Sequence, residues 1–272
     1  MTIKDHFLTQ ENFQLTETDI PGVYKTSPIP KELDKYYETV NYISHHQDAK
    51  SFKVQLYKFF QRFNLKYKSK ILKSEIDLQS PVLDYGCGAG EFLHFIENDY
   101  KTFGFEPNIS ARNAAASKLH RSVLLENIND IADESLGAIT LWHVFEHVGN
   151  PEELLDTFHR KLKPEGCLII AVPNHTSYDA VHYGEYWAAY DVPRHLYHYT
   201  RKGMTNFLKD KTWKLKKVKP LRLDSFYISM LSEKYKKSAL IWLKGAVFGT
   251  ISNFKASKTG EYSSLIYVIG KN

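Results

Sequence analysis

Residues 83–90 read LDYGCGAG and combine an acid with three closely spaced glycines. Asp84 stands two residues before Gly86, and Gly88 and Gly90 follow at every second position. The turn comes directly after a short apolar run. Glycine lets a backbone turn sharply and approach a ligand closely, and such turns after a strand commonly hold a nucleotide. The spacing therefore raises the question of which nucleotide-like ligand the chain binds.

The acid and the glycine spacing disfavour a dinucleotide. The dinucleotide fingerprint is G-x-G-x-x-G, but here Glu91 stands at the place of its third glycine. A carboxylate at Asp84 is a poor neighbour for a pyrophosphate and suits a ligand with a cationic amino group. Glu106 follows 22 residues after Asp84, near the usual offset of an acid that binds ribose hydroxyls. S-adenosylmethionine has the ammonium, the sulfonium and the ribose that these residues would bind.

Two further stretches gather ionisable side chains. WHVFEHV contains His143, Glu146 and His147, and YDVPRHLYHYT contains Asp191, Arg194, His195 and His198. A hydroxyl acceptor must lose its proton during methyl transfer, and a histidine is suited to take it.

Our preferred base among these residues is His195, with His147 second, and Asp191 and Arg194 would orient the acceptor. The structural alternatives are a helix cap at Glu146 and His147, and a loop held by an Asp–Arg pair.

Strands and helices alternate from residue 81 onward. Apolar runs predict strands at 81–86, 101–108, 122–127, 137–148 and 167–174, and the intervening segments have helical patterns. Helices between buried strands indicate right-handed crossovers and a parallel sheet covered on both faces. Ligands of such sheets bind at the carboxyl ends of the strands, which is where the glycine turn lies.

The series VLDYGCGAG, GFEPN, ITLWHVFEHVGNPEELL and LKPEGCLIIAVPN resembles the class I S-adenosylmethionine-dependent methyltransferases. The likeness is greatest to the methyltransferase-23-like branch, which includes relatives of the ubiquinone-biosynthesis O-methyltransferases. It covers about residues 78–272, with specific motifs over 81–175. The resemblance implies an α/β, Rossmann-like fold with a seven-stranded, mostly parallel sheet whose last strand is antiparallel. The segments 213–225 and 263–271 would form the final pair of strands.

The resemblance also implies contacts with S-adenosyl-L-methionine. Asp84 and the backbone at Tyr85, Gly86 and Gly88 would hold the methionine part. Glu106 would bind the ribose hydroxyls, with Pro107 and Asn108 beside it. Asn127 and Ile128 would flank the adenine, and Trp142 and His143 would close the pocket. For Trp142, simple core packing is the alternative.

The chain divides in sequence near residue 77. Residues 1–77 predict an N-terminal lid of helical and irregular structure, with a helix from about Ala49 to Lys73, and residues 78–272 predict the methyltransferase domain. Within that domain, the insertion 174–200 and the helical segment 226–251 would cover the acceptor side.

Charge and composition limit the partners. The net charge is +5, and residues 201–272 hold about 16 Lys and Arg against about four Asp and Glu. Such asymmetry fits an anionic partner or a solvated lysine-rich face. The segment 226–251 mixes lysines with apolar residues, which fits peripheral membrane contact, a dimer helix or a cover over the sheet. No RNA-binding module is recognisable, so RNA is disfavoured, and we expect no DNA.

Other features point to a cytoplasmic protein without a metal. The two cysteines, Cys87 and Cys167, build neither a disulfide framework nor a zinc site. The first residues lack the apolar core of a signal peptide, so we expect a cytoplasmic location. His45, His46 and Asp48 have no diagnostic metal spacing, and we predict no metal.

These observations predict an enzyme that methylates a small-molecule or glycan-type acceptor, most readily at oxygen. The alternatives are an RNA methyltransferase and a protein that binds S-adenosylmethionine without turnover. The identity of the acceptor and the oligomeric state do not follow from the sequence.

Overall fold

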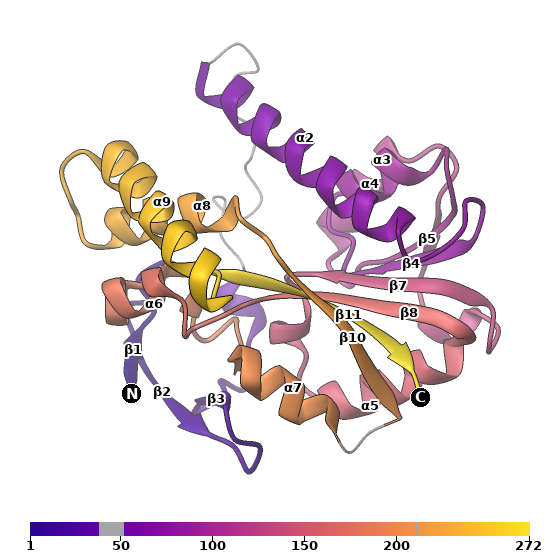
Figure 1. Ribbon diagram of the computed structural model, residues 1–272, viewed down its shortest axis with the longest axis horizontal. Helices are drawn as coiled ribbons and strands as arrows, with labels where there is room; N and C mark the ends of the chain where they lie inside the picture. The colour runs from indigo at the N-terminus through magenta and orange to yellow at the C-terminus, as the bar shows by residue number, and fades with distance from the viewer. Residues whose placement is uncertain (38–51, 210–211) are drawn as a thin grey trace. The chain divides into compact units, whose positions relative to one another are not determined.

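The computed structural model describes residues 1–37, 52–209 and 212–272 (Figure 1). The contacts group the chain into two compact units. Unit 1 comprises Met1–Glu38, His143–Gly149 and Ala171–Tyr267. Unit 2 comprises Thr39–Trp142, Asn150–Ile170 and Val268–Asn272. The sequence division at residue 77 stays a prediction.

The larger sheet has seven strands, as the sequence predicts. Its spatial order is β10-β11-β8-β7-β4-β5-β6, and it is mostly parallel with its last strands antiparallel. The strands are β4 (Pro81–Tyr85), β5 (Lys101–Phe105), β6 (Val123–Leu125), β7 (Leu136–Trp142), β8 (Leu162–Pro173), β10 (Trp213–Pro220) and β11 (Ser264–Lys271). The predicted Rossmann-like α/β fold is therefore confirmed. The central strand β4 pairs in parallel with β5 on one side and β7 on the other.

Among the described residues, unit 2 contains four α-helices. They are α2 (Phe52–Lys73), α3 (Glu91–Ile96), α4 (Ile109–Lys118) and α5 (Pro151–Lys161). The predicted helix from Ala49 thus extends over Phe52–Lys73 in the described residues. Leu93 of α3 and Phe158 of α5 are fully buried. Asn150 caps α5, and Pro151 occupies its first turn, where the missing N–H costs nothing.

The edge strand β10 accounts for part of the basic charge near the C-terminus. β10 stands at one end of the sheet order and includes four lysines, Lys214, Lys216, Lys217 and Lys219. Charged side chains on an edge strand discourage pairing with other chains. These lysines are therefore explained by the fold without an anionic partner.

Residues 2–27, which were expected to be part of a helical and irregular segment, form strands, whereas the helix expected later in the same segment is present as α2. β1 (Thr2–Lys4), β2 (Asn12–Glu17) and β3 (Val23–Ser27) pair with β9 (Tyr197–Tyr199) in the order β1-β2-β3-β9. Phe13 and Leu15 alternate with exposed neighbours along β2, which is the two-residue period of a half-buried strand. The alternation covers only a few residues, and the partner strand β9 lies far away in sequence. For these two reasons the sheet cannot be predicted from the local sequence.

The insertion 174–200 and the N-terminal strands share one core in unit 1. The insertion contains α6 (Tyr178–Tyr183), two short 3-10 turns and β9. Its Tyr183, Trp187 and Tyr190 are buried in one cluster with Ile3 and Phe13. The segment expected to be a separate cover is thus packed together with the segment expected to be a separate lid.

The remaining helices of unit 1 are α7 (Arg201–Lys209), α8 (Asp224–Tyr235) and α9 (Ile241–Thr259). The predicted helical stretch 226–251 is two helices that lie side by side (Figure 1). Two glycines of α9 permit this approach, because a Cβ on Gly245 or Gly249 would lie 2.9 Å from the Cα of Met230 or Phe226. Among the helices in the described ranges, none combines the length and the apolar character that crossing a bilayer requires.

Candidate active site

The glycine turn after β4 has the backbone that its sequence requires. Gly86, Gly88 and Gly90 all have positive φ, from 54° to 76°. The Gly86 N–H donates to the Phe105 carbonyl at 2.7 Å, which ties the turn to the end of β5. A Cβ on Gly88 would meet nothing within 4 Å, so the space beside this residue is open. The turn therefore presents an unobstructed backbone at the carboxyl end of the sheet.

Asp84 is buried beneath this turn. Its side chain belongs to a residue only 3% exposed, and its Oδ1 accepts a 2.6 Å hydrogen bond from Thr140 Oγ1 on β7. Burial raises the pKa of the Asp84 carboxyl to about 7, although the Thr140 hydrogen bond and the charge of Lys68 act in the opposite direction. A carboxylate of this kind gains most from a cationic ligand, because the ligand would replace the lost hydration.

Glu106 binds the backbone of the same turn. Its Oε2 accepts from the Gly88 N–H at 2.8 Å, and its Oε1 accepts from the Asn108 N–H at 2.9 Å. Both oxygens lie at the end of β5, beside the glycine turn, as the sequence predicts for a ribose-binding acid. The carboxylate is only partly buried, so lone pairs remain for ligand hydroxyls.

The other predicted cofactor-binding residues of unit 2 are exposed, cap a helix or turn, or stack on a neighbouring ring. Pro107 and Asn108 are exposed, and the Asn108 side chain caps α4 by accepting from the Ala111 N–H. Asn127 is exposed and caps a 3-10 turn that begins at Ile128. The ring of Tyr85 stacks on Phe105 at 4.8 Å between centroids.

Trp142 is the last residue of β7, and its indole ring is packed while its N–H group stays available to a ligand. Its ring packs edge-on against Phe92, with 5.2 Å between centroids, and Lys68 Nζ lies 4.6 Å from its ring centroid. Within the described residues, the indole Nε1 is buried and has no hydrogen-bond partner. Core packing and a role toward a ligand are therefore compatible at this position.

His143 begins the part of unit 1 that follows β7 in the chain. Its Nε2 lies 2.8 Å from Asp224 Oδ2, and its Nδ1 lies 3.4 Å from Glu146 Oε1. Burial opposes protonation, but Asp224 first and Glu146 second raise the pKa of His143 to about 10. The residue adopts a positive φ of 59°, which few non-glycine residues do. His143 is thus a charged ring held between two carboxylates.

Glu146, His147 and His195 form what we call the histidine cluster. One ligand atom of each lies within 4.8 Å of the others. The rings of His147 and His195 meet edge-on at 4.6 Å between centroids, and His195 Nε2 is 4.0 Å from Glu146 Oε1. Burial and the neighbouring His147 lower the pKa of His195 to about 4. The Glu146 pKa lies below its ordinary value, because His143 and the other imidazoles outweigh the opposing effect of burial.

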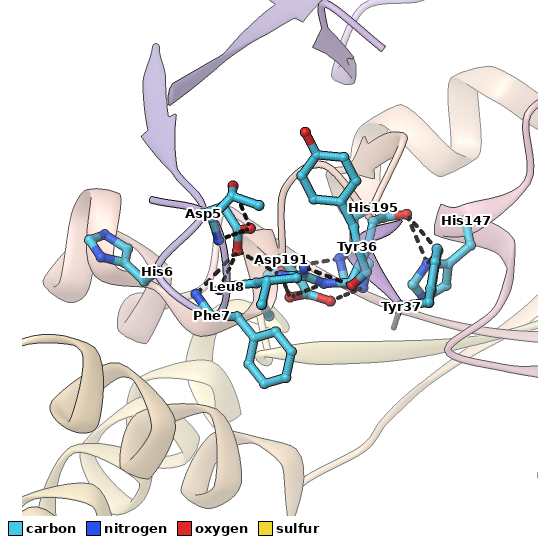
Figure 2. Close-up of polar contacts among 12 residues, drawn as sticks. Asp5, His6, Phe7, Leu8, Tyr36, Tyr37, His147, Asp191 and His195 are labelled. Atoms are coloured by element: carbon cyan, nitrogen blue, oxygen red, sulfur yellow. Dashed lines mark hydrogen bonds and ion pairs between the residues drawn. The ribbon is translucent and has the colours of Figure 1, made fainter. Parts of the chain in front are cut away.

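The Arg194 side chain forms ion pairs with two aspartates of unit 1. The side chain is 1% exposed, and its Nη2 donates to Asp191 Oδ1 at 2.7 Å and to Asp5 Oδ1 at 2.9 Å. Asp5 in turn accepts from the N–H groups of Phe7 and Leu8 (Figure 2). The Asp–Arg pair considered as a structural alternative is therefore present, with Arg194 buried and Asp191 half-buried. The pKa of Asp191 lies below its ordinary value, since Arg194 outweighs the effect of burial.

The comparisons with known proteins identify the family. Residues 55–215 match the family described as a methyltransferase domain. The chain belongs to this methyltransferase family. This membership confirms the predicted resemblance to class I S-adenosylmethionine-dependent methyltransferases and S-adenosyl-L-methionine as their cofactor. The narrower likeness to the ubiquinone-biosynthesis enzymes stays a prediction.

Curated relatives of this methyltransferase are similar over part of their length. The cyclopropane-fatty-acyl-phospholipid synthase of Escherichia coli K12 is 31% identical over 96 residues, which cover 33% of this chain and 25% of the synthase. An uncharacterized protein of Methanocaldococcus jannaschii is 26% identical over 145 residues, 49% of this chain and 56% of that protein. The chain thus spans between a quarter and just over half of these relatives.

Solved structures share the fold at low identity. A Haemonchus contortus phosphoethanolamine N-methyltransferase 2 in complex with S-adenosyl-L-methionine matches with a TM-score of 0.55 and 14% identity, over 88% of this chain and 59% of that one. A complex of the Haloferax volcanii Trm112 methyltransferase activator with its assigned methyltransferase gives 0.55 and 13% identity, over 78% and 90%.

A small pocket of the methyltransferase lies within unit 1. Its lining includes Glu146, Trp187, His195, His198 and Tyr199. In the part of the chain that the structure describes, the Glu146 oxygens and the Tyr199 hydroxyl are buried without hydrogen-bond partners. Three of the four catalytic residues predicted from sequence, His147, Asp191 and His195, thus lie in or near one polar cluster, with Arg194 holding Asp191 beneath it.

Several partners of the predicted site residues were not foreseen from the sequence. Thr140 is a polar residue within an apolar strand, and that exception could have marked it as a partner for Asp84. Asp5, Tyr37 and Asp224 gave no such signal, because each meets its partner across a long sequence separation. For example, the Tyr37 hydroxyl lies 3.1 Å from Nδ1 of His147, although the two residues are 110 positions apart in the sequence (Figure 2).

Proposed function

We propose that the protein transfers the methyl group of S-adenosylmethionine to a hydroxyl of a small-molecule or glycan-type acceptor. Unit 2 would hold the cofactor, with Asp84 at the ammonium, the backbone from Tyr85 to Gly88 at the methionine part, and Glu106 at the ribose. The cofactor supplies a methyl group on a good leaving group, so the protein's task is placement and removal of the acceptor proton.

The observation that carries this proposal is the pocket of unit 1. A carboxylate, imidazoles and a tyrosine hydroxyl converge there among aromatic side chains. The pocket has room for about one water molecule, so it suits the hydroxyl end of an acceptor rather than a whole ring. His195 and His147 remain the first and second choices for activating the hydroxyl, because each ring can present a lone pair at Nε2. Asp191 orients this group, and Arg194 acts through Asp191 as a positioning residue.

Methyl transfer to a hydroxyl breaks two bonds, O–H and C–S, and forms a C–O bond. The acceptor loses its hydroxyl proton, the oxygen forms a bond to the methyl carbon, and the electron pair of the carbon–sulfur bond returns to sulfur. S-adenosylhomocysteine and a methyl ether are the products.

Incubation with labelled S-adenosylmethionine and a panel of acceptors tests the proposal. The panel holds sugars and phenols, matched amines, and RNA, with product analysis by mass spectrometry. We expect methyl ethers from the wild-type protein and none from Asp84→Asn. Products methylated only at nitrogen or only on RNA would overturn the assignment. No product together with tight S-adenosylhomocysteine binding would favour the alternative of a silent binding protein.

We also propose that α9 contacts an anionic lipid surface, which would bring a lipid-linked acceptor to the enzyme. Leu240, Trp242 and Leu243 are 57–68% exposed at its start, with Lys244 beside them. From residue 234 to 258 every acidic or basic side chain is a lysine, which complements an anionic bilayer. Co-sedimentation with anionic vesicles, but not with neutral ones, is expected, and Trp242→Ser with Leu243→Ser should abolish it. Equal binding to both vesicle types, or binding unaffected by the substitutions, refutes this contact.

A further inference from the structure

The histidine cluster has the composition of a metal site. It comprises one carboxylate and two imidazoles, and one ligand atom of each lies within 4.8 Å of the others. Glu146 and His147 come from the 3-10 turn Phe145–His147, and His195 comes from the segment before β9. The backbone joins these segments, because the Leu196 N–H donates to the Glu146 carbonyl at 2.8 Å. The three side chains are thus held together by the fold of unit 1.

The two rings are oriented as metal ligands usually are. His147 Nδ1 lies 2.9 Å from the Arg194 carbonyl oxygen, and His195 Nδ1 lies 3.0 Å from the Ala189 carbonyl oxygen. A carbonyl oxygen only accepts, so each Nδ1 must carry the hydrogen and each neutral ring has its lone pair at Nε2. Histidines that bind metals almost always donate their other N–H in this way, which fixes the tautomer and the ring orientation.

Glu146 supplies an independent reason for a cation. The residue is 1% exposed, and within the described ranges neither of its carboxylate oxygens accepts a hydrogen bond. His143 Nδ1 lies 3.4 Å from Oε1, but His143 is also bound by Asp224. Oε1 thus has only a long contact with a charged ring that Asp224 shares, and Oε2 has no hydrogen-bond partner within the described ranges. A buried carboxylate oxygen without a partner is costly, and a bound cation would complete it.

We propose that Glu146, His147 and His195 bind a divalent cation of the first transition row, such as Zn²⁺, Mn²⁺ or Co²⁺. Imidazole ligands favour these ions, whereas Mg²⁺ prefers an all-oxygen shell. Bonds of about 2.0–2.2 Å would bring neighbouring ligand atoms to roughly 3.3 Å of one another, so the present separations would close by at most about 1.5 Å. The sequence-based expectation of no metal considered the two cysteines and the group His45, His46 and Asp48, which lies outside the described residues.

Three protein ligands leave coordination positions open for an acceptor oxygen. This use of the cation rests on the proposed function, whereas binding of the cation does not. A hydroxyl bound to a divalent cation loses its proton more readily, and the proton passes to water on the side where His147 is only half-buried. Both histidines then act as ligands, and activation of the hydroxyl comes from the charge of the cation.

Metal binding is measured directly on the full-length protein after chelation. Equilibrium dialysis with Zn²⁺, Mn²⁺, Co²⁺ and Mg²⁺ gives stoichiometry and affinity, and the visible absorption of Co²⁺ reports nitrogen and oxygen ligands. The variants are Glu146→Gln, which keeps the volume of the side chain, and His147→Gln at the half-buried position. His120→Gln, an exposed histidine elsewhere in the chain, is the matched control. Circular dichroism confirms folding, and S-adenosylhomocysteine titration is run on each protein.

We expect one transition-metal ion per chain, with Mg²⁺ bound more weakly. Each cluster variant should lose at least about tenfold in affinity, since loss of even an outer contact of a metal site has this effect. His120→Gln should bind as the wild type does. No stoichiometric binding, or binding that folded cluster variants retain, overturns the proposal. If S-adenosylhomocysteine still binds and methyl ethers still form in that case, the metal site fails while the proposed function stands. A wild-type protein that binds the metal but no S-adenosylhomocysteine shows the reverse.

Discussion

Replacing Asp84 by asparagine should move stability and cofactor binding in opposite directions. The carboxyl is buried, and its pKa is raised from 3.8 to about 7. A shift of about 3 units corresponds to roughly 4 kcal/mol of disfavour for the charged form, which is an upper limit for the cost that it imposes above pH 7. Asparagine has nearly the same shape, and its amide can bond Thr140 in either direction. The unfolding free energy of Asp84→Asn should therefore exceed that of the wild type by about 1–3 kcal/mol at pH 8.

The sign of the pH dependence follows from linkage. Because the folded-state pKa of Asp84 lies above the unfolded value, the native protein binds more protons than the unfolded chain between about pH 4 and 7. The contribution of this carboxyl to stability is therefore present below pH 4 and is lost as the pH rises through 7. The advantage of the asparagine variant should vanish near pH 4 and be complete near pH 8.

Cofactor binding should show the reverse pattern. The ammonium of S-adenosylhomocysteine needs the ionised carboxylate, and at pH 6 about one-tenth of a group with a pKa near 7 is ionised. Wild-type affinity at pH 6 should be roughly tenfold below its plateau, and the asparagine variant should bind poorly at every pH.

Urea unfolding across pH 4–8 and calorimetric titration across pH 5–8 measure both effects. Asp99→Asn is the control, because Asp99 forms an exposed ion pair with Lys73 and should change neither quantity by more than about 0.5 kcal/mol. A stable variant that still binds S-adenosylhomocysteine within threefold of the wild type would refute the role of Asp84. Wild-type affinity that is constant from pH 6 to 7.5 would refute the raised pKa.

Three further substitutions, one of them with Gly88→Ala as its comparison, test the site and its support. Glu106→Gln should weaken S-adenosylhomocysteine binding at least about tenfold in calorimetry, because it removes the charge that accepts ribose hydroxyls, while the fold persists since one oxygen can still accept from Gly88. Gly104→Ala should cost about 1–3 kcal/mol in urea unfolding, since the added Cβ would lie 2.6 Å from Leu93 Cδ1; Gly88→Ala has no such clash, so its cost should come only from a φ of 54°. Arg194→Met should cost about 3–5 kcal/mol by leaving Asp5 and Asp191 buried without their cation, and an unfolding midpoint equal to that of the wild type would show that the pairing is dispensable.

The region from β4 to β8 could be predicted because its signals are local. Each strand is an apolar run followed by a turn, and the glycine turn includes the backbone requirement and the acid within eight residues. Asp84 and Glu106 could be paired from their offset alone, because parallel neighbours bring the ends of successive strands together. The fold and the family followed from these signals.

The second sheet could not be predicted, because its pairing is long-range. β3 is only five residues long, and its partner β9 is three residues long, with Val23 opposite Tyr199. Such short segments have weak periodicity. The sequence near Val23 therefore does not indicate that its partner strand lies more than 170 residues away. The same limit applies to Asp5, whose buried position depends on Arg194.

The buried ion pair and the histidine cluster are parts of one arrangement. The Arg194 guanidinium is held by Asp5 and Asp191, and the backbone carbonyl of the same residue accepts the Nδ1–H of His147. The next residue in the chain, His195, is a member of the cluster. Fixing the arginine side chain therefore fixes both the acceptor that sets the tautomer of one ring and the backbone that presents the other. The N-terminal segment, through Asp5, thus helps to set the geometry of the cluster although it supplies none of its members, which gives a physical reason for packing that segment against the insertion.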